Sequence, residues 1–68
     1  MKTIKLKFKQ NDNIKILVDY GRWKKGHTGY VYNIGMECGD AQYDYAVMLD
    51  GDAFCSGFNE NELEEDNI

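Results

Sequence analysis

Apolar and polar side chains alternate in several short stretches of the chain, and this period of two predicts β-strands. In residues 3–9, Ile4, Leu6 and Phe8 lie on one face and lysines on the other, as in a half-buried strand. Polar residues at 10–13 predict a turn, and residues 14–18 predict a second strand. The first 18 residues are therefore expected to form a hairpin.

Two glycines three residues apart, Gly26 and Gly29, mark the entry from a loop into a third strand at residues 28–34. Glycine adopts positive φ angles that other residues resist, which suits a tight loop. The alternation breaks at the end of this strand and predicts a bulge after Asn33. Residues 35–42 have no period and contain two glycines, so a mobile loop is expected there.

A second hairpin is predicted further along the chain. The strand at residues 43–49 alternates, and one of its faces is formed by Tyr43, Tyr45, Val47 and Leu49. The Asp50-Gly51 pair that follows fits the two positive-φ positions of a type I′ turn. The returning strand is expected at residues 53–58, with one side formed by Phe54, Ser56 and Phe58.

The end of the chain carries a helix-start signature. Asn59 and Glu62 have the spacing of a capping box, and Phe58 and Leu63 have that of a hydrophobic staple. A single helical turn is expected directly after Asn59, with the two apolar residues closing one end of a barrel. Residues 64–68 predict a solvent-exposed acidic tail.

The composition limits the architecture to one small domain. A chain of 68 residues buries only about 60% of its unfolded surface, so its core is thin. Apolar residues make up 43%, which is too many for a disordered chain, and seven glycines with no proline suit a compact β domain. We expect a single all-β domain over residues 1–68, a barrel of about five strands with an extra N-terminal strand in residues 1–12 and a short closing helical turn.

The N-terminal residues lack the continuous apolar run of a signal peptide or a membrane-spanning helix. The expected location is cytoplasmic, without membrane contact. The two cysteines, Cys38 and Cys55, are then expected to be reduced.

Charge is distributed very unevenly along the sequence. All eight lysines and arginines lie in residues 1–27 with two acids, a local charge of +6, whereas residues 28–68 hold ten acids and no base, a charge of -10, which gives the net -4. Such asymmetry produces a dipolar surface that steers a charged partner. Alternatively, strands from the two halves lie side by side and pair lysines with acids.

The loop at residues 19–27 is the first candidate for a contact surface. Aromatic and arginine side chains dominate binding hot spots, and this loop carries Tyr20, Arg22, Trp23, Lys24, Lys25 and His27. In a second interpretation, Trp23 folds back as a lid over the barrel end and the cations only solvate the loop. Tyr30 and Tyr32, on one face of the following strand, form either a binding platform or a cover over neighbouring strands.

The order of these elements resembles the SH3-like barrels of the KOW and photosystem-subunit type. The resemblance covers about residues 13–65 and is carried by the segments 26–31 (Gly-His-Thr-Gly-Tyr-Val), 45–49 (Tyr-Ala-Val-Met-Leu) and 58–63 (Phe-Asn-Glu-Asn-Glu-Leu). The chain is also similar to short SH3-like proteins of phages and prophages of Gram-positive bacteria, which share a run like Tyr43 to Val47. The resemblance implies a binding role. It does not extend to proline-peptide recognition, because that uses an acidic loop where residues 22–27 are basic.

Catalytic and metal-binding sets are not expected. His27 and Ser56, the only histidine and the only serine, have no activating sequence context, and the cysteines are scattered without a C-x-x-C pair. Asp50 and Asp52 lack the ligand spacing of a dedicated calcium loop. We therefore expect a protein without a cofactor that is not an enzyme.

The favoured hypothesis is a protein-protein module, phage-encoded, that binds and modulates a host protein. Its acidic face would imitate nucleic-acid phosphate and inhibit a nucleic-acid enzyme or a defence protein. The residues assigned to this face are Asp40, Asp44, Asp50, Asp52, Glu60, Glu62 and Glu64. Whether the protein is a monomer or a homodimer stays open.

The alternative hypothesis is nucleic-acid binding by the basic N-terminal half. Basic grooves with aromatic platforms bind single strands in this way. The cationic residues would be Lys5, Lys7, Lys9, Arg22, Lys24, Lys25 and His27, with Tyr20 and Trp23 stacking on bases. The isoelectric point of about 4.7 is low for a protein that binds phosphate alone.

Overall fold

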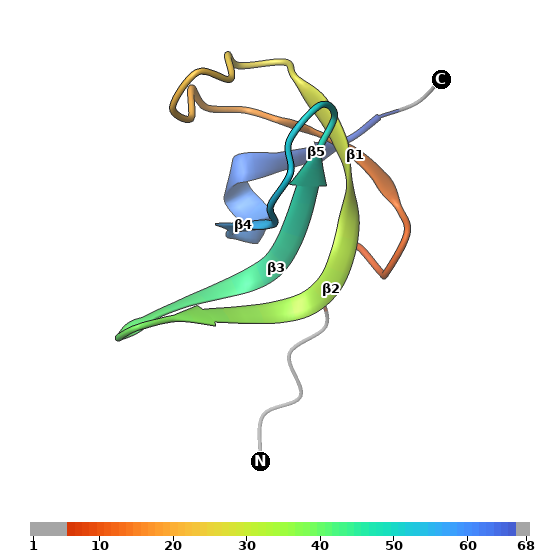
Figure 1. Cartoon of the computed structure of the whole chain (residues 1–68). Coiled ribbons are helices and arrows are strands. Elements are labelled where there is room, and N and C mark those ends of the chain that lie inside the picture. Colours follow the sequence, from red (N-terminus) through yellow and green to blue (C-terminus); the bar gives the residue numbers. More distant parts are fainter. Residues whose placement is uncertain (1–5, 67–68) are drawn as a thin grey trace.

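Five antiparallel strands form one sheet in the computed structural model, which describes residues 6–66 (Figure 1). The strands are β1 (Asn13–Ile16), β2 (Thr28–Cys38), β3 (Ala41–Leu49), β4 (Ser56–Phe58) and β5 (Leu63–Glu65), with a 3₁₀ turn, η1 (Glu60–Glu62), before β5. Their order is β4-β3-β2-β1-β5, and within residues 6–66 the edge strands β4 and β5 do not pair with each other. The predicted all-β class is confirmed, and the sheet is open.

The sheet curls around a small core. Its buried side chains are Phe8, Ile14, Ile16, Val31, Tyr45, Val47, Leu49, Phe58 and Leu63. The strand predicted at residues 14–18 is present as β1, with Ile14 and Ile16 in this core. The alternation predicted for one face of β3 is confirmed for Tyr45, Val47 and Leu49, whereas Tyr43 is only half-buried. Fully burying one such side chain contributes roughly 1.5–3 kcal/mol, so each member of so small a core matters.

Residues 6–12 do not form the predicted strand, and the predicted N-terminal hairpin is wrong for this part of the chain. β1 pairs on one side with β2 and on the other with β5, so neither of its edges is free. Phe8 is instead inserted into the core, and residues 11 and 12 hydrogen-bond to the backbone of Val31. The predicted strand's first residues, 3–5, lie outside the described residues.

β2 and β3 extend beyond the strands predicted at residues 28–34 and 43–49 and form a hairpin, so the loop expected at residues 35–42 is wrong. The two strands pair as far as Cys38 and Ala41, leaving only Gly39 and Asp40 as the turn. Gly39 has a φ of 63°, which permits so tight a reversal. A bulge is present, but the register shift falls between Val31 and Asn33, before the predicted place.

The β3–β4 connection also differs from the prediction. Gly51 has a φ of 87°, but Asp50 is not among the positive-φ residues of the described chain, so the type I′ turn is not formed. The Asp50-Gly51 turn is closed by a bond from the Asp52 N–H to the Leu49 carbonyl (2.9 Å), and β4 starts only at Ser56. Phe54 therefore lies outside the strand and is 78% exposed, whereas a place beside Ser56 and Phe58 was expected.

The predicted capping box and staple are confirmed. The Asn59 N–H donates to Glu62 Oε1 (2.9 Å), and Phe58 and Leu63 both lie in the core. Glu64 and Glu65 are solvent-exposed as predicted, but they do not form a tail, because β5 continues through Glu65 and pairs with β1. Lys15 lies opposite Glu64, with Nζ 3.6 Å from Oε2. Residues 67–68 lie outside the described residues.

Tyr45 joins the N-terminal segment to the sheet. Its hydroxyl accepts a bond from the Phe8 N–H (3.1 Å) and donates to Glu60 Oε1 (3.0 Å). Glu60 also accepts a bond from the Lys7 N–H, and the Phe8 and Tyr45 rings meet edge to face at 5.6 Å. Burial raises the pKa of the Tyr45 hydroxyl above its ordinary value, and the Glu60 carboxylate adds to the effect.

Replacing Tyr45 by Phe should lower the free energy of unfolding by about 1–3 kcal/mol, because the buried Phe8 N–H loses its acceptor. The raised pKa adds a pH dependence: its contribution is complete below the unfolded-state pKa of about 10 and is lost as the pH rises toward the folded-state pKa. Denaturant unfolding at pH 8 and at pH 11 measures both effects. A Tyr45→Phe variant as sensitive to alkali as the wild type would contradict this account.

Gly29→Ala should destabilise the protein by about 1–3 kcal/mol, because the new Cβ would lie 2.5 Å from the Met48 carbonyl oxygen and 2.9 Å from the Leu49 Cα. Gly57→Ala is the matched comparison. Its Cβ would lie 2.3 Å from Cδ2 and 2.5 Å from Cγ of the half-buried Tyr43, a clash that a change of the tyrosine χ1 rotamer can relieve, whereas the clash at Gly29 is with backbone atoms. Thermal unfolding of both variants should show the larger loss for Gly29→Ala; equal losses would contradict the close approach of the two backbones.

Candidate functional site

The loop between β1 and β2 meets the turn after β3 around Trp23. We call Arg22, Trp23, His27, Asp50 and Asp52 the Trp23 cluster. The loop is shaped by a short bridge between residues 20 and 23, whose N–H and carbonyl groups exchange two bonds of 2.8 Å. Gly21, with a φ of 58°, permits that reversal and leaves Arg22 exposed at its tip.

The Trp23 ring is held from several sides. Its Nε1–H donates to Asp52 Oδ2 (3.3 Å), and its ring is stacked on that of His27, with centroids 4.4 Å apart and an interplanar angle of 25°. The Arg22 guanidinium lies over the ring at 4.5 Å, a cation–π geometry. Trp23 is half-buried and packs against the core. This geometry agrees with the interpretation of Trp23 as a lid.

His27 is engaged in holding the turn. Its Nε2 lies 2.8 Å from the Asp50 carbonyl oxygen, which only accepts, so Nε2 carries the hydrogen. The Asp50 carboxylate accepts a bond from the Thr28 hydroxyl. The structure records no hydrogen bond in residues 6–66 between His27 and Ser56, which is buried on β4. The cluster therefore has the geometry of a structural clamp.

The remaining residues of the loop differ in exposure. Lys24 and Lys25 are exposed, and the Lys25 N–H is bonded to Asp19 Oδ1 (2.8 Å). Tyr20 packs its ring against Phe58, with centroids 5.0 Å apart, yet stays 43% exposed. Tyr20, Lys24 and Lys25 thus border the Trp23 cluster and face solvent.

Tyr30 and Tyr32 do not behave as a pair. Tyr30 is half-buried between Asn13 of β1 and Met48 of β3, which agrees with a cover over neighbouring strands. Tyr32 lies at the bulge and is 51% exposed, and its carbonyl accepts a bond from the Gln10 side chain (3.1 Å). Only Tyr32 offers its ring to a partner.

The acidic residues come from separate places, and most are engaged within the chain. Asp44 Oδ2 accepts the Glu60 N–H (3.0 Å), and Asp50 and Asp52 belong to the Trp23 cluster. Asp40 lies in the β2–β3 turn, far from the residue 19–27 loop in Figure 1. These carboxylates therefore serve as acceptors for neighbouring loops, and those of Asp40 and the Trp23 cluster do not come together.

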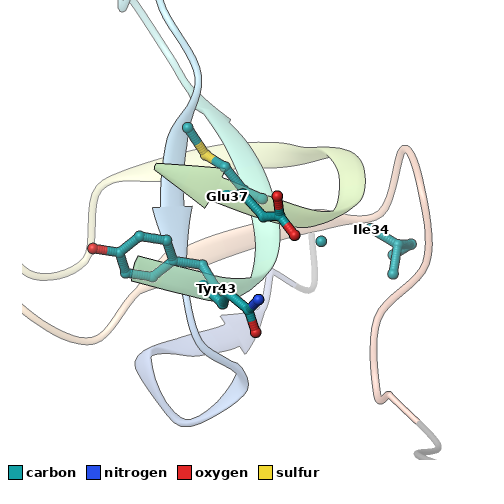
Figure 2. Close-up of a pocket in the computed structure, with 6 residues that line it drawn as sticks. Ile34, Glu37 and Tyr43 are labelled. Carbon is teal, nitrogen blue, oxygen red and sulfur yellow. The ribbon is translucent and has the colours of Figure 1, made fainter. Parts of the chain in front are cut away.

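The sequence did not point to a hollow near the end of the β2–β3 hairpin (Figure 2). It has a volume of about 400 Å³ and is lined by Ile34, Gly35, Met36, Glu37, Gln42 and Tyr43. Figure 2 shows Glu37 between Ile34 and Tyr43. Ile34 and Met36, two positions apart, have the spacing of a strand, which would have extended β2 to this hollow. The glycines beside them favoured a loop instead.

Metal-binding groups are not apparent in the described part of the chain. Across residues 6–66, the structure gathers no three His, Cys, Asp or Glu side chains in a geometry suited to a metal ion. Cys38 and Cys55 are free thiols. Among the described residues, no helix has the length and apolar character needed to span a membrane.

Comparison with known proteins finds no matching family model, and neither a curated protein nor a solved structure matches the chain significantly.

Asp52→Ala should release the indole of Trp23, the only tryptophan in the chain. The expected results are a red-shifted fluorescence emission, because the ring gains solvent, and a loss of about 1–2 kcal/mol in the free energy of unfolding. Asp40→Ala is the matched control, since that acid lies in the distant β2–β3 turn. Emission unchanged in both variants would contradict the clamp.

Proposed function

We propose that this protein is a non-enzymatic module that binds another protein. The observation that carries the proposal is the exposure of large apolar side chains by a chain with so small a core. They are Phe54 (78% exposed), Tyr32 (51%), Ile34 (44%) and Tyr20 (43%). Contiguous exposed apolar patches mark interaction sites, and the centres of protein-protein interfaces are enriched in aromatic side chains.

We further propose an SH3-like architecture for the sheet. Five antiparallel strands, a short 3₁₀ turn before the last strand and a core inside the curl support it. The resemblance to phage-encoded SH3-like proteins favours a cytoplasmic host protein as the partner and modulation of that protein as the role.

The narrower idea of phosphate mimicry receives less support. Asp44, Asp50 and Asp52 each accept a hydrogen bond from a neighbouring segment, and Glu64 is paired with Lys15. These contacts fix carboxylates in positions that the fold requires rather than in a regular row. We therefore favour the apolar side chains over the acids as the main contacts.

Direct nucleic-acid binding is the second candidate, and the exposure of Arg22, Lys24 and Lys25 favours it. Against it stands the geometry of Trp23, whose ring already contacts the Arg22 guanidinium and the His27 ring. Stacking a base on Trp23 would require displacing one of them, at a cost of about 0.5–1 kcal/mol for an exposed cation–π contact.

Affinity capture from a lysate of Gram-positive bacteria, with and without nuclease, tests the proposal. The wild type should recover one protein in both samples. A Tyr32→Ser/Phe54→Ser double variant should recover at least about fivefold less, the loss typical of removing an aromatic contact. Asn61→Ser, an exposed change on η1, is the matched control. Recovery that depends on nucleic acid would overturn the proposal in favour of the second candidate.

A further inference from the structure

The far half of the β2–β3 hairpin extends beyond the rest of the sheet (Figure 1). β1 pairs only with residues 28–30 of β2, and β4 pairs only with residues 45–47 of β3. Residues 33–38 and 41–44 therefore form a two-stranded arm, which we call the β2–β3 arm. Isolated two-stranded ribbons are marginally stable, and a third strand stabilises them.

Within residues 6–66, no strand pairs with the β2 edge of this arm. In the described N-terminal segment, the Asn11 N–H donates to the Val31 carbonyl (2.8 Å) and the Gln10 side chain to the Tyr32 carbonyl, and no bond from residues 6–12 to β2 is recorded beyond Tyr32. Beyond that point the Ile34 N–H donates to the neighbouring Asn33 side chain, Oδ1, at 3.0 Å. An added strand can replace so local a bond.

The edge carries only some of the features that usually prevent strand pairing. Proteins protect such edges with charged side chains, above all lysine, with proline or with β-bulges. Residues 33–38, Asn-Ile-Gly-Met-Glu-Cys, follow the bulge between Val31 and Asn33 and contain one acid, but neither lysine nor proline. Its side chains Ile34 and Met36 line the 400 Å³ hollow together with Tyr43. The edge thus combines a β2 backbone that has no neighbouring strand within residues 6–66 with a place for an apolar side chain.

Charge indicates what kind of strand would fit. The arm and its turn carry three acids; Asp44 is bonded to the Glu60 N–H, which leaves Glu37 and Asp40, and residues 28–68 contain no base. The ion pair recorded in residues 6–66, Lys15–Glu64, lies elsewhere on the sheet. A second copy of the arm would add its own acids beside these two, which is unfavourable. A basic strand is complementary.

We infer that residues 33–38 of β2 receive an extended, basic segment of the partner protein by strand addition. One apolar side chain of that segment enters the hollow beside Ile34 and Met36, and its cations face Glu37 and Asp40. This mode of recognition, in which backbone bonds provide affinity and alternate side chains provide specificity, follows general sheet chemistry. The inference rests on the proposed protein-binding function.

The probe for this inference is a synthetic peptide of alternating lysine and valine, titrated into the full-length protein and followed by amide hydrogen exchange. Amides in residues 33–38 should become protected. The same peptide N-methylated on alternate residues, on the edge that faces β2, should not bind, because it lacks the donors for strand addition. An alternating glutamate and valine peptide should also fail to bind.

Side-chain variants test the role of charge. Glu37→Gln and Asp40→Asn should each weaken binding of the lysine peptide by about two- to five-fold, the usual range for one exposed ion pair. Glu65→Gln, an exposed acid on β5, is the matched control and should leave the affinity unchanged.

Three outcomes would overturn the inference: equal binding of both charged peptides, protection confined to residues 20–27, or a wild-type dimer formed through the β2 edge. If the Tyr32 and Phe54 substitutions still lower partner capture in that case, the protein-binding function stands without this mode of recognition. If capture is also insensitive to them, both proposals fall.

Discussion

The buried hydroxyl of Tyr45 is the contact on which the closing of this small core depends. It lies at the centre of β3 and bonds at once to the Phe8 N–H and to Glu60 on η1. Because Phe8 reaches the core only if its backbone donor is satisfied, the hydroxyl allows the N-terminal segment to replace a strand there. Without it, the apolar side of β3 would lose both a cover and the anchor of the 3₁₀ turn.

Carboxylates also join separate segments of this small fold. Asp44, Asp52 and Glu60 each accept bonds from N–H groups of other segments, and such charge-assisted bonds contribute more than exposed ion pairs. The acids of the second half of the sequence thus act mainly as hydrogen-bond acceptors for other segments. Pairing of strands from opposite halves contributes one recorded ion pair, Lys15–Glu64.

Sequence patterns correctly predicted the parts of the fold that are determined by residues close together along the chain. The alternation in β3 and the capping box at Asn59 and Glu62 were found because each is fixed by neighbours along the chain. The prediction of an N-terminal strand was wrong because the Phe8 N–H donates to the hydroxyl of Tyr45, 37 positions away. The loop predicted at residues 35–42 failed because pairing across the hairpin overrides the turn preference of Gly35.

The candidate site shows the same division. The sequence singled out Trp23, Arg22 and His27, but only the fold shows that the indole is clamped by Asp52 from a turn 29 positions away. The sequence places Tyr30 and Tyr32 on one face of a strand, but the bulge gives them different surroundings, so that Tyr30 is half-buried and Tyr32 is exposed. Exposure depends on which segments meet, so a sequence pattern can nominate binding residues and cannot rank them.

The length of the β2–β3 arm is difficult to explain by stability alone. Its residues 33–42 lie outside the core, and strand pairing there is supported by one neighbour only. Fixing the backbone of each residue costs roughly 1–2 kcal/mol of conformational entropy, which an exposed ribbon recovers poorly. A shorter hairpin turning soon after Asn33 would leave the core intact and remove an unprotected edge. The persistence of strand geometry as far as Cys38 is consistent with an arm whose pairing is completed by a partner.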